Sequence, residues 1–351
     1  MNHMQRYLAE EFAEDYHEGR ISRRQALKLL ASLTGSMFLA ASFLAACAPT
    51  PAQSTATLAA SATTLPTAGL TGAPANSTGA ASAVASTTSG PAATAAATTP
   101  ASATASPTAA AGQPAYGTVV PDDPAISAGP LEFPGSGATV LGYLARPIGA
   151  GPFPVLLVCH ENRGLTAHIE DVARRFGKAG YAALAVDLLS RQGGSAAVGE
   201  SGAPGALGGI APNQFVQDFR SGWEYLKAQT FAQAERLGML GFCFGGGVTW
   251  LVAEGLPELK AAVPFYGPPP PVDQVPNIQA AVLAMYGALD SRITSSAPAM
   301  EAAMQQANKV FEKVIYPDAD HAFFNDTGTR YNSAAAQDAW GKTLAWFRKY
   351  L

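Results

Sequence analysis

The sequence contains very little cysteine. Of its 351 residues only three are cysteines, namely Cys47, Cys159 and Cys243. So few thiols exclude a scaffold held together by disulfides. In an oxidising compartment Cys159 and Cys243 could pair with each other. Such a bond would inactivate any nucleophile among them, so we treat it as a hazard and not as an expected structural feature.

Charge is absent from one long stretch. Residues 48–121 contain no Lys, Arg, Asp or Glu and consist mainly of Ala, Thr, Ser, Pro and Gly. A segment of this composition cannot bury enough apolar surface to offset the entropy lost on ordering. We therefore predict a disordered linker over 48–116, either a plain linker or an O-glycosylated stalk. A single folded domain is predicted over 117–351.

An excess of positive charge is also missing. The chain has 22 Lys and Arg residues against 26 Asp and Glu residues, which gives a formal net charge of −4. There is no basic patch and no aromatic-rich ladder. These absences argue against a nucleic-acid partner.

The first 47 residues have the features of an export signal. The segment 22–28 (SRRQALK) resembles a twin-arginine signal, an uncharged apolar stretch follows over 29–46, and Leu44-Ala45-Ala46-Cys47 resembles a lipobox. We predict that the export machinery recognises this segment, that it is cleaved, and that Cys47 is lipidated and tethers the protein to a membrane outside the cytoplasm. The lead over 1–20 would then be lost. A permanent anchor helix is the alternative, because the apolar stretch is about long enough to span a bilayer.

The C-terminal part alternates between strand and helix patterns. Apolar runs predict strands over 139–145, 153–159, 181–186, 237–241, 259–266, 280–286 and 312–316. Helical patterns cover 169–179, 215–228, 248–254, 297–308 and 332–349. This alternation predicts an α/β fold with a mostly parallel sheet and helices on both faces. In such sheets ligands bind beyond the carboxyl ends of the strands.

The most informative motif surrounds Cys243. The sequence Gly241-Phe242-Cys243-Phe244-Gly245 follows a predicted strand and precedes a predicted helix. This is the setting of a nucleophile elbow, here with cysteine in place of the commoner serine. The glycines leave room for a sharp turn. A thiol at this point indicates covalent acyl transfer. A small buried thiol in a tight turn is the alternative.

Two further residues complete a catalytic order. Asp290 and His321 each follow a later predicted strand, and the order nucleophile, acid, base is that of α/β-hydrolases. The imidazole would manage the proton, and the carboxylate would fix its tautomer. His160 and His168 compete with His321. The competing acids are Asp187, Asp318 and Asp320.

The loop after the second predicted strand reads Cys159-His160-Glu161-Asn162-Arg163-Gly164. An α/β-hydrolase places its second oxyanion donor in this loop, so we predict backbone N–H donors at Asn162 and, in the elbow, at Phe244. Glu161 would face the nucleophile. Its alternative role is an ordinary loop carboxylate that pairs with Arg163 or Arg191.

Over about 131–351 these residues resemble the dienelactone hydrolase family, whose members are similar to carboxymethylenebutenolidase. The resemblance is carried by the elbow, the loop at 160–164, Val186-Asp187-Leu188 with Ser190-Arg191-Gln192-Gly193, Phe265-Tyr266-Gly267, and His321-Ala322-Phe323-Phe324-Asn325-Asp326. It implies an α/β-hydrolase fold, a Cys-His-Asp triad and an acyl-thioester intermediate.

The resemblance also implies roles for neighbouring residues. It gives Glu161 the task of helping to take the thiol proton when substrate binds. Family members hold a substrate carboxylate with two arginines, one of which falls on Arg191. The other position holds Asn325 here, with Arg330 nearby in sequence.

We therefore expect a hydrolase of a small ester or lactone that needs no metal and no organic cofactor. A ligand-binding lipoprotein without activity, or a thioesterase or peptidase on the same fold, are the alternatives.

Overall fold

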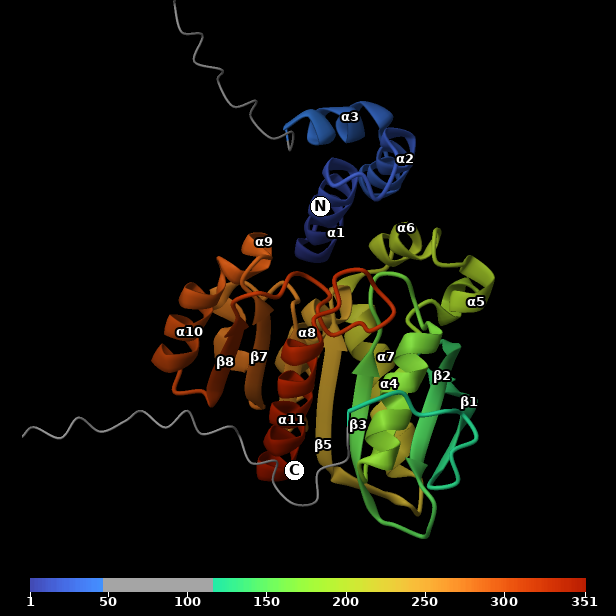
Figure 1. Ribbon diagram of the computed structural model, residues 1–351. Coiled ribbons are helices and arrows are strands. Elements are labelled where there is room, and N and C mark those ends of the chain that lie inside the picture. The colour runs from blue at the N-terminus through green and yellow to red at the C-terminus, as the bar shows by residue number, and fades with distance from the viewer. Residues whose placement is uncertain (47–115) are drawn as a thin grey trace, which may run out of the picture. The chain divides into compact units, whose positions relative to one another are not determined.

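The computed structural model describes residues 1–46 and 116–351 (Figure 1). The predicted linker and Cys47 therefore lie outside the described residues. Eight strands form one sheet in the order β1-β2-β4-β3-β5-β6-β7-β8. The strands are β1 (Ile126–Gly135), β2 (Ala138–Pro147), β3 (Phe153–Cys159), β4 (Ala182–Val186), β5 (Ala232–Phe242), β6 (Ala261–Phe265), β7 (Ala281–Gly287) and β8 (Phe311–Tyr316).

The sheet is parallel from β4 to β8, and only the β1–β2 and β2–β4 pairs are antiparallel. Strands β3, β4, β6 and β7 are apolar along nearly their whole length because both faces of this sheet are covered. The predicted α/β fold with a mostly parallel sheet is confirmed, and each of the seven predicted strands is present. The sequence analysis missed β1, an edge strand.

Helices cover both faces of the sheet (Figure 1). The larger ones are α4 (Ala167–Lys178), α7 (Pro212–Lys227), α8 (Phe244–Gly255), α10 (Ala297–Gln306) and α11 (Ser333–Tyr350). Phe176 of α4 packs against Trp340 of α11, with ring centroids 4.6 Å apart, so these two helices form one layer. Helices α7 and α8 pack together over β5. Shorter helices η1 (Ser190–Gln192), α5 (Ser195–Val198), α6 (Ala203–Gly208), η2 (Val272–Asn277) and α9 (Ser291–Thr294) lie in the connections.

Three helices precede the linker: α1 (His3–His17), α2 (Arg23–Thr34) and α3 (Met37–Ala46). Asn2 and Ser22 cap the first two with capping boxes. These helices belong to the same compact unit as the C-terminal domain, with α1 packed on α6 and α8. The buried face of α1 follows a helical spacing and consists of Met4, Tyr7, Leu8, Ala9, Glu11, Phe12 and Ala13.

Among the described helices none is by itself long and apolar enough to cross a membrane. The pair α2 and α3 meets that criterion jointly by length and composition, but it is bent by 118° at the break between the two helices.

Glu254, near the end of α8, provides a test of the packing. Burial and the nearby charge of Asp273 raise the pKa of this carboxyl to about 7, and within residues 1–46 and 116–351 its buried Oε1 has no hydrogen-bond partner. Because the folded-state pKa lies above that of the unfolded chain, the carboxyl destabilises the fold as the pH rises from about 4.5 to 7. We expect Glu254→Gln to stabilise the protein at pH 8 by up to about 3 kcal/mol relative to its effect at pH 5.

Urea unfolding at both pH values measures this difference. Glu235→Gln, at an exposed position of β5, is the matched control for the loss of one carboxylate. Equal effects of Glu254→Gln at pH 5 and pH 8 would contradict the raised pKa.

Candidate active site

Cys243 joins β5 to α8 in a strained backbone conformation. Its φ of 58° and ψ of −122° are unusual for a residue with a side chain. The Cys243 N–H donates to the Phe265 carbonyl at 3.1 Å, and its own carbonyl accepts from Gly246 N–H at 2.9 Å. These bonds hold the turn and raise the side chain at the carboxyl edge of the sheet.

Glycines make this turn possible. A Cβ on Gly245 would lie 2.7 Å from the Cys159 carbonyl oxygen, and one on Gly241 would collide with the backbone of Gly245. The elbow thus packs backbone against backbone, and a side chain at either glycine would displace the strand–helix junction.

His321 and Asp290 form a buried pair. Nδ1 of His321 lies 2.7 Å from Oδ2 of Asp290, and the relative exposure of the two residues is 1 % and 2 %. Asp290 follows β7 and caps α9, whereas His321 lies in the loop between β8 and α11. The structure therefore brings together the acid and the histidine that chain order selects.

The competing residues have other partners. Asp187 accepts hydrogen bonds from the Ser195 N–H and hydroxyl. Asp320 accepts from the backbone N–H of His321, and Asp318 is exposed. The remaining two histidines are held elsewhere: His160 by the Leu188 N–H and the Glu161 carbonyl, and His168 by Asp326.

The electrostatic surroundings of His321 favour its charged form. Burial lowers the pKa of this imidazole, but the charges of Glu11 and Cys243 and the hydrogen bond to Asp290 outweigh burial and raise the pKa well above its ordinary value.

Helix α1 places two polar side chains directly against this pair. The Tyr7 hydroxyl lies 3.2 Å from the Cys243 Sγ and 3.4 Å from the His321 Nε2. Burial raises the pKa of Tyr7 well above its ordinary value, so the hydroxyl keeps its proton. Oε1 of Glu11 lies 3.7 Å from the same imidazole nitrogen.

Arg292, two residues after Asp290, holds these α1 side chains in place. Its guanidinium lies 2.6 Å from the Glu11 carboxylate and 3.1 Å from that of Glu14, and it stacks over the Tyr7 ring at 4.9 Å. Burial raises the pKa of Glu11, but the charges of His321 and Arg292 outweigh it and lower the pKa to about 2. Glu11 is therefore a buried, ionised carboxylate.

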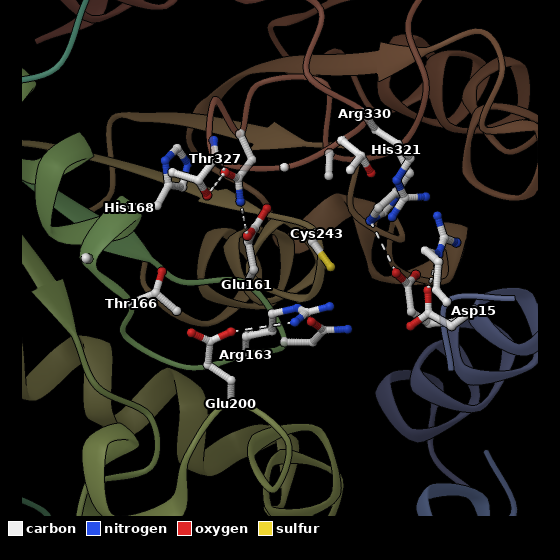
Figure 2. A pocket seen from close by; sticks show the side chains of 18 residues that line it. Asp15, Glu161, Arg163, Thr166, His168, Glu200, Cys243, His321, Thr327 and Arg330 are labelled. Carbon is white, nitrogen blue, oxygen red and sulfur yellow. Dashed lines mark hydrogen bonds and ion pairs between the residues drawn. The ribbon is translucent and has the colours of Figure 1, made fainter. Parts of the chain in front are cut away.

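A cavity of about 540 Å³ opens beside Cys243 and His321. Figure 2 shows it between the loop that carries Glu161 and Arg163 and the side chains of α1. Glu161, Asn162, Asn325 and Arg330 line it, so the structure brings these predicted residues to one site. The N–H of Phe244 belongs to the first turn of α8, where N–H groups have no partner within the helix.

Glu161 lies beside Cys243 in Figure 2, and both side chains line the cavity. Its Oε2 accepts a hydrogen bond of 2.8 Å from the Asn325 side chain, and its buried Oε1 has no partner in the described part of the chain. Neither alternative ion pair is formed, because Arg163 lies 3.5 Å from Glu200 and Arg191 pairs with Asp218.

Arg191, which was predicted to bind substrate, is not brought to this cavity. Its guanidinium lies 2.7 Å from the Asp218 carboxylate and donates to the Ser136 carbonyl, and it does not line the cavity. Arg330 does line the cavity, and its Nη1 is buried without a partner among the residues that the structure describes. Arg20 and Arg163 line the cavity as well, so of the two arginines predicted to bind substrate only Arg330 faces it.

The ligand atoms of Glu11, Cys243 and His321 lie within 4.8 Å of one another and form a group that could hold a metal ion. A cation there would engage the thiolate and imidazole lone pairs that nucleophilic catalysis needs.

Tyr7, Glu11 and Arg292 were not predicted from the sequence as residues of the site. One local signal was available: α1 has a tyrosine and a glutamate four residues apart on an otherwise apolar face. No pattern near Arg292 indicates that its partners lie more than 270 residues earlier in the chain.

A cysteine on a strand–helix elbow, followed by an acid and a histidine at the ends of later parallel strands, defines an α/β-hydrolase.

Comparison with known proteins identifies the family. A sequence model of the dienelactone hydrolase family matches residues 140–351. A protein of Methylorubrum extorquens named "Putative carboxymethylenebutenolidase" is 35% identical over 246 residues, covering 66% of this chain and 84% of that one. A protein of Escherichia coli O157:H7 with the same name is 38% identical over 248 residues, covering 66% and 89%.

A solved structure is also similar. It is described as a "Putative Dienelactone Hydrolase" of Klebsiella pneumoniae and shows 36% identity, a TM-score of 0.60, and coverage of 64% of this chain and 100% of that one. The chain belongs to the dienelactone hydrolase family and is a hydrolase.

Proposed function

We propose that the protein cleaves a small carboxylic ester or lactone through the triad Cys243, His321 and Asp290. The observation that supports this most directly is the 2.7 Å bond from Asp290 to the Nδ1 of an imidazole that lies within 4.8 Å of the elbow thiol. Relatives named as carboxymethylenebutenolidases point to a lactone or a similar activated ester as the substrate.

In this mechanism the thiol proton passes to the His321 Nε2, with the help of Glu161, before the reaction. The Cys243 Sγ then attacks the carbonyl carbon as a thiolate beside an imidazolium. The C–S bond forms as the C–O bond to the leaving alkoxide breaks, and the imidazolium returns the proton to that alkoxide. Water then attacks the acyl-thioester and releases the acid and the free thiol. The N–H groups of Phe244 and Asn162 would stabilise the oxyanion, at about 3 kcal/mol of barrier for each donor.

A panel of lactones, aryl esters, thioesters and peptides tests the proposal. We expect turnover of esters or lactones, and a transient acyl adduct on Cys243 by mass spectrometry. Turnover of thioesters or peptides alone would overturn the proposed substrate class, and the absence of both turnover and adduct would overturn the enzymatic function.

Glu161 is proposed to help take the thiol proton when substrate binds. Because Oε1 is the buried acceptor without a partner, Glu161→Gln should lower kcat/KM by about 10²-fold, the usual worth of a general base. The matched control is Glu200→Gln, which also lines the cavity but has an exposed carboxylate near Arg163. Equal kcat/KM in the two variants would contradict the role of Glu161.

We also propose that the chain is exported and tethered to a membrane through a lipid on Cys47. The motifs at 22–28 and 44–47 support this. Cell fractionation tests it: the protein should lie in the membrane fraction with a lipid-modified Cys47 N-terminus, and Cys47→Ala should abolish that modification. Retention of the N-terminal residues in the membrane form would contradict the cleavage.

A further inference from the structure

Helix α1 makes a specific contact with the catalytic residues. Tyr7 and Glu11 lie one turn apart on its buried face and contact Cys243 and His321. Around them the face is apolar, and Gln5 adds a hydrogen bond of 2.9 Å to the Gly208 carbonyl. Burying an ionised carboxylate is costly unless it is paired, so the position of Glu11 depends on the cations that surround it.

Those cations form an anion site. Arg292 contacts the Glu11 carboxylate at 2.6 Å, and the charge of Arg330 also lowers the pKa of Glu11. Nη1 of each arginine is buried and has no hydrogen-bond partner in the described part of the chain. Only Arg330 lines the cavity together with Cys243, whereas Arg292 reaches it through Glu11. Two guanidinium groups that act on one carboxylate and have donors to spare suit a planar anion.

We propose that α1 is an intramolecular occupant of the active site, in which the Glu11 carboxylate fills an anion site of Arg292 and Arg330 that takes a substrate carboxylate once α1 has left. The Tyr7 hydroxyl covers the Cys243 Sγ in the same state. This inference rests on the proposed function, because it names the substrate class as esters that carry a carboxylate.

The position of α1 in the chain supports its release. Cleavage before Cys47 would remove α1 together with the signal segment. If 23–46 spanned a membrane, α1 and the C-terminal domain would lie on opposite sides. The docked α1 therefore belongs to the chain before export, and either route of export exposes the anion site.

A tether maintains the docking. While α1 is covalently attached, its effective concentration at the site is on the order of millimolar, and cutting the tether removes this advantage at low protein concentration. A protease site inserted between 60 and 100 of the full chain allows this cut to be made after folding.

The probes are iodoacetate, which carries a carboxylate, and neutral iodoacetamide. Both alkylate thiols, and Cys159 is fully buried, so in a chain that carries Cys47→Ser the expected target is Cys243, with Cys243→Ala as the check. Cutting the chain at nanomolar concentration should raise the iodoacetate-to-iodoacetamide rate ratio at Cys243 at least about tenfold. A synthetic peptide of residues 1–20, added at millimolar concentration, should reverse the increase.

Two variants of the uncut chain refine the test. Glu11→Gln removes the charge from the anion site and should raise the same ratio, whereas Glu10→Gln on the outer side of α1, where Glu10 pairs with Arg6, should leave it unchanged. In the cut chain, Arg292→Gln should abolish the preference for iodoacetate. Thermal unfolding confirms that each variant is folded.

An unchanged ratio after cutting would overturn the inference. A fall in kcat/KM for esters after cutting would also overturn it, because α1 would then be a part of the active site that catalysis requires. Failure of the proposed function has a different signature: neither form hydrolyses any ester. Equal ester hydrolysis before and after the cut, together with an unchanged ratio, would refute the occupant and leave the hydrolase standing.

Discussion

Replacing Cys243 with alanine should lower kcat for ester hydrolysis by at least about 10⁴-fold. The reason is that the covalent route disappears, and only oxyanion stabilisation and substrate binding remain. Little space is left at the elbow for a substitute nucleophile. Cys243 lies in a strained turn at φ 58°, and the backbones of Gly241 and Gly245 on either side of it are in close contact. Initial rates with the best ester of the panel, measured after α1 has been released, give the size of the effect.

Cys159→Ala is the control for this prediction. Cys159 ends β3 and is fully buried, and burial and the neighbouring Cys243 raise the pKa of its thiol well above the ordinary value. Its loss should cost about 1 kcal/mol of stability and leave kcat within a few-fold of the parent. Full activity of Cys243→Ala would assign the nucleophile to another residue and remove the basis of the triad.

The sequence predicted the elbow and its acid–histidine pair because parallel strands impose the geometry. Residues that directly follow such strands gather at one edge of the sheet, however far apart they lie in the chain. Cys243, Asp290 and His321 follow β5, β7 and β8, so their order along the sequence already implied a common site. Only the strand pattern is needed to place these residues together, and the apolar runs of the sequence display that pattern clearly.

Strand β1 escaped prediction for a local reason. It lies at the sheet edge, pairs only with β2, and includes Gly129, Pro130 and Pro134. Prolines and exposed side chains are tolerated there because one side of an edge strand makes no ladder hydrogen bonds. Its pattern therefore lacks the long apolar run that identified the inner strands.

Arg191 shows the limit of transferring a role by position. The residue is present, but the buried Asp218 of α7 captures its guanidinium away from the cavity. Arg292 and Arg330 could not be ranked from the sequence, because their importance depends on contacts with α1. Glu11 is about 280 residues from Arg292 in the sequence, and the segment 1–47 was expected only to direct export.

The contacts of these charged residues could not be predicted from the sequence for one physical reason. Backbone periodicity determines which strands form, but side-chain pairing across the chain decides which charges remain available to a ligand. In this protein Arg330 lines the pocket and Arg292 contacts Glu11, so the chain itself supplies a carboxylate on which both guanidinium charges act. The reactive thiol and its anion site are thus covered by one helix.

Asp290→Asn should lower kcat by about 10⁴-fold while leaving the fold intact. An amide at this position can hold the imidazole in the wrong tautomer and cannot stabilise its charged form. The bond it would replace is the 2.7 Å contact between Oδ2 of Asp290 and Nδ1 of His321. Asp318→Asn, at the exposed competing carboxylate in the same region, is the matched control and should keep the parental kcat.

The pH profile separates this role from a structural one. Asp290 is one of the groups that raise the pKa of His321, so its neutralisation lowers that pKa. Imidazolium must protonate the leaving group, and the alkaline limb of kcat/KM should therefore move to lower pH in Asp290→Asn. A uniformly reduced profile with an unmoved limb would show that Asp290 supports only the loop, because a loss of packing does not change the charge that His321 experiences.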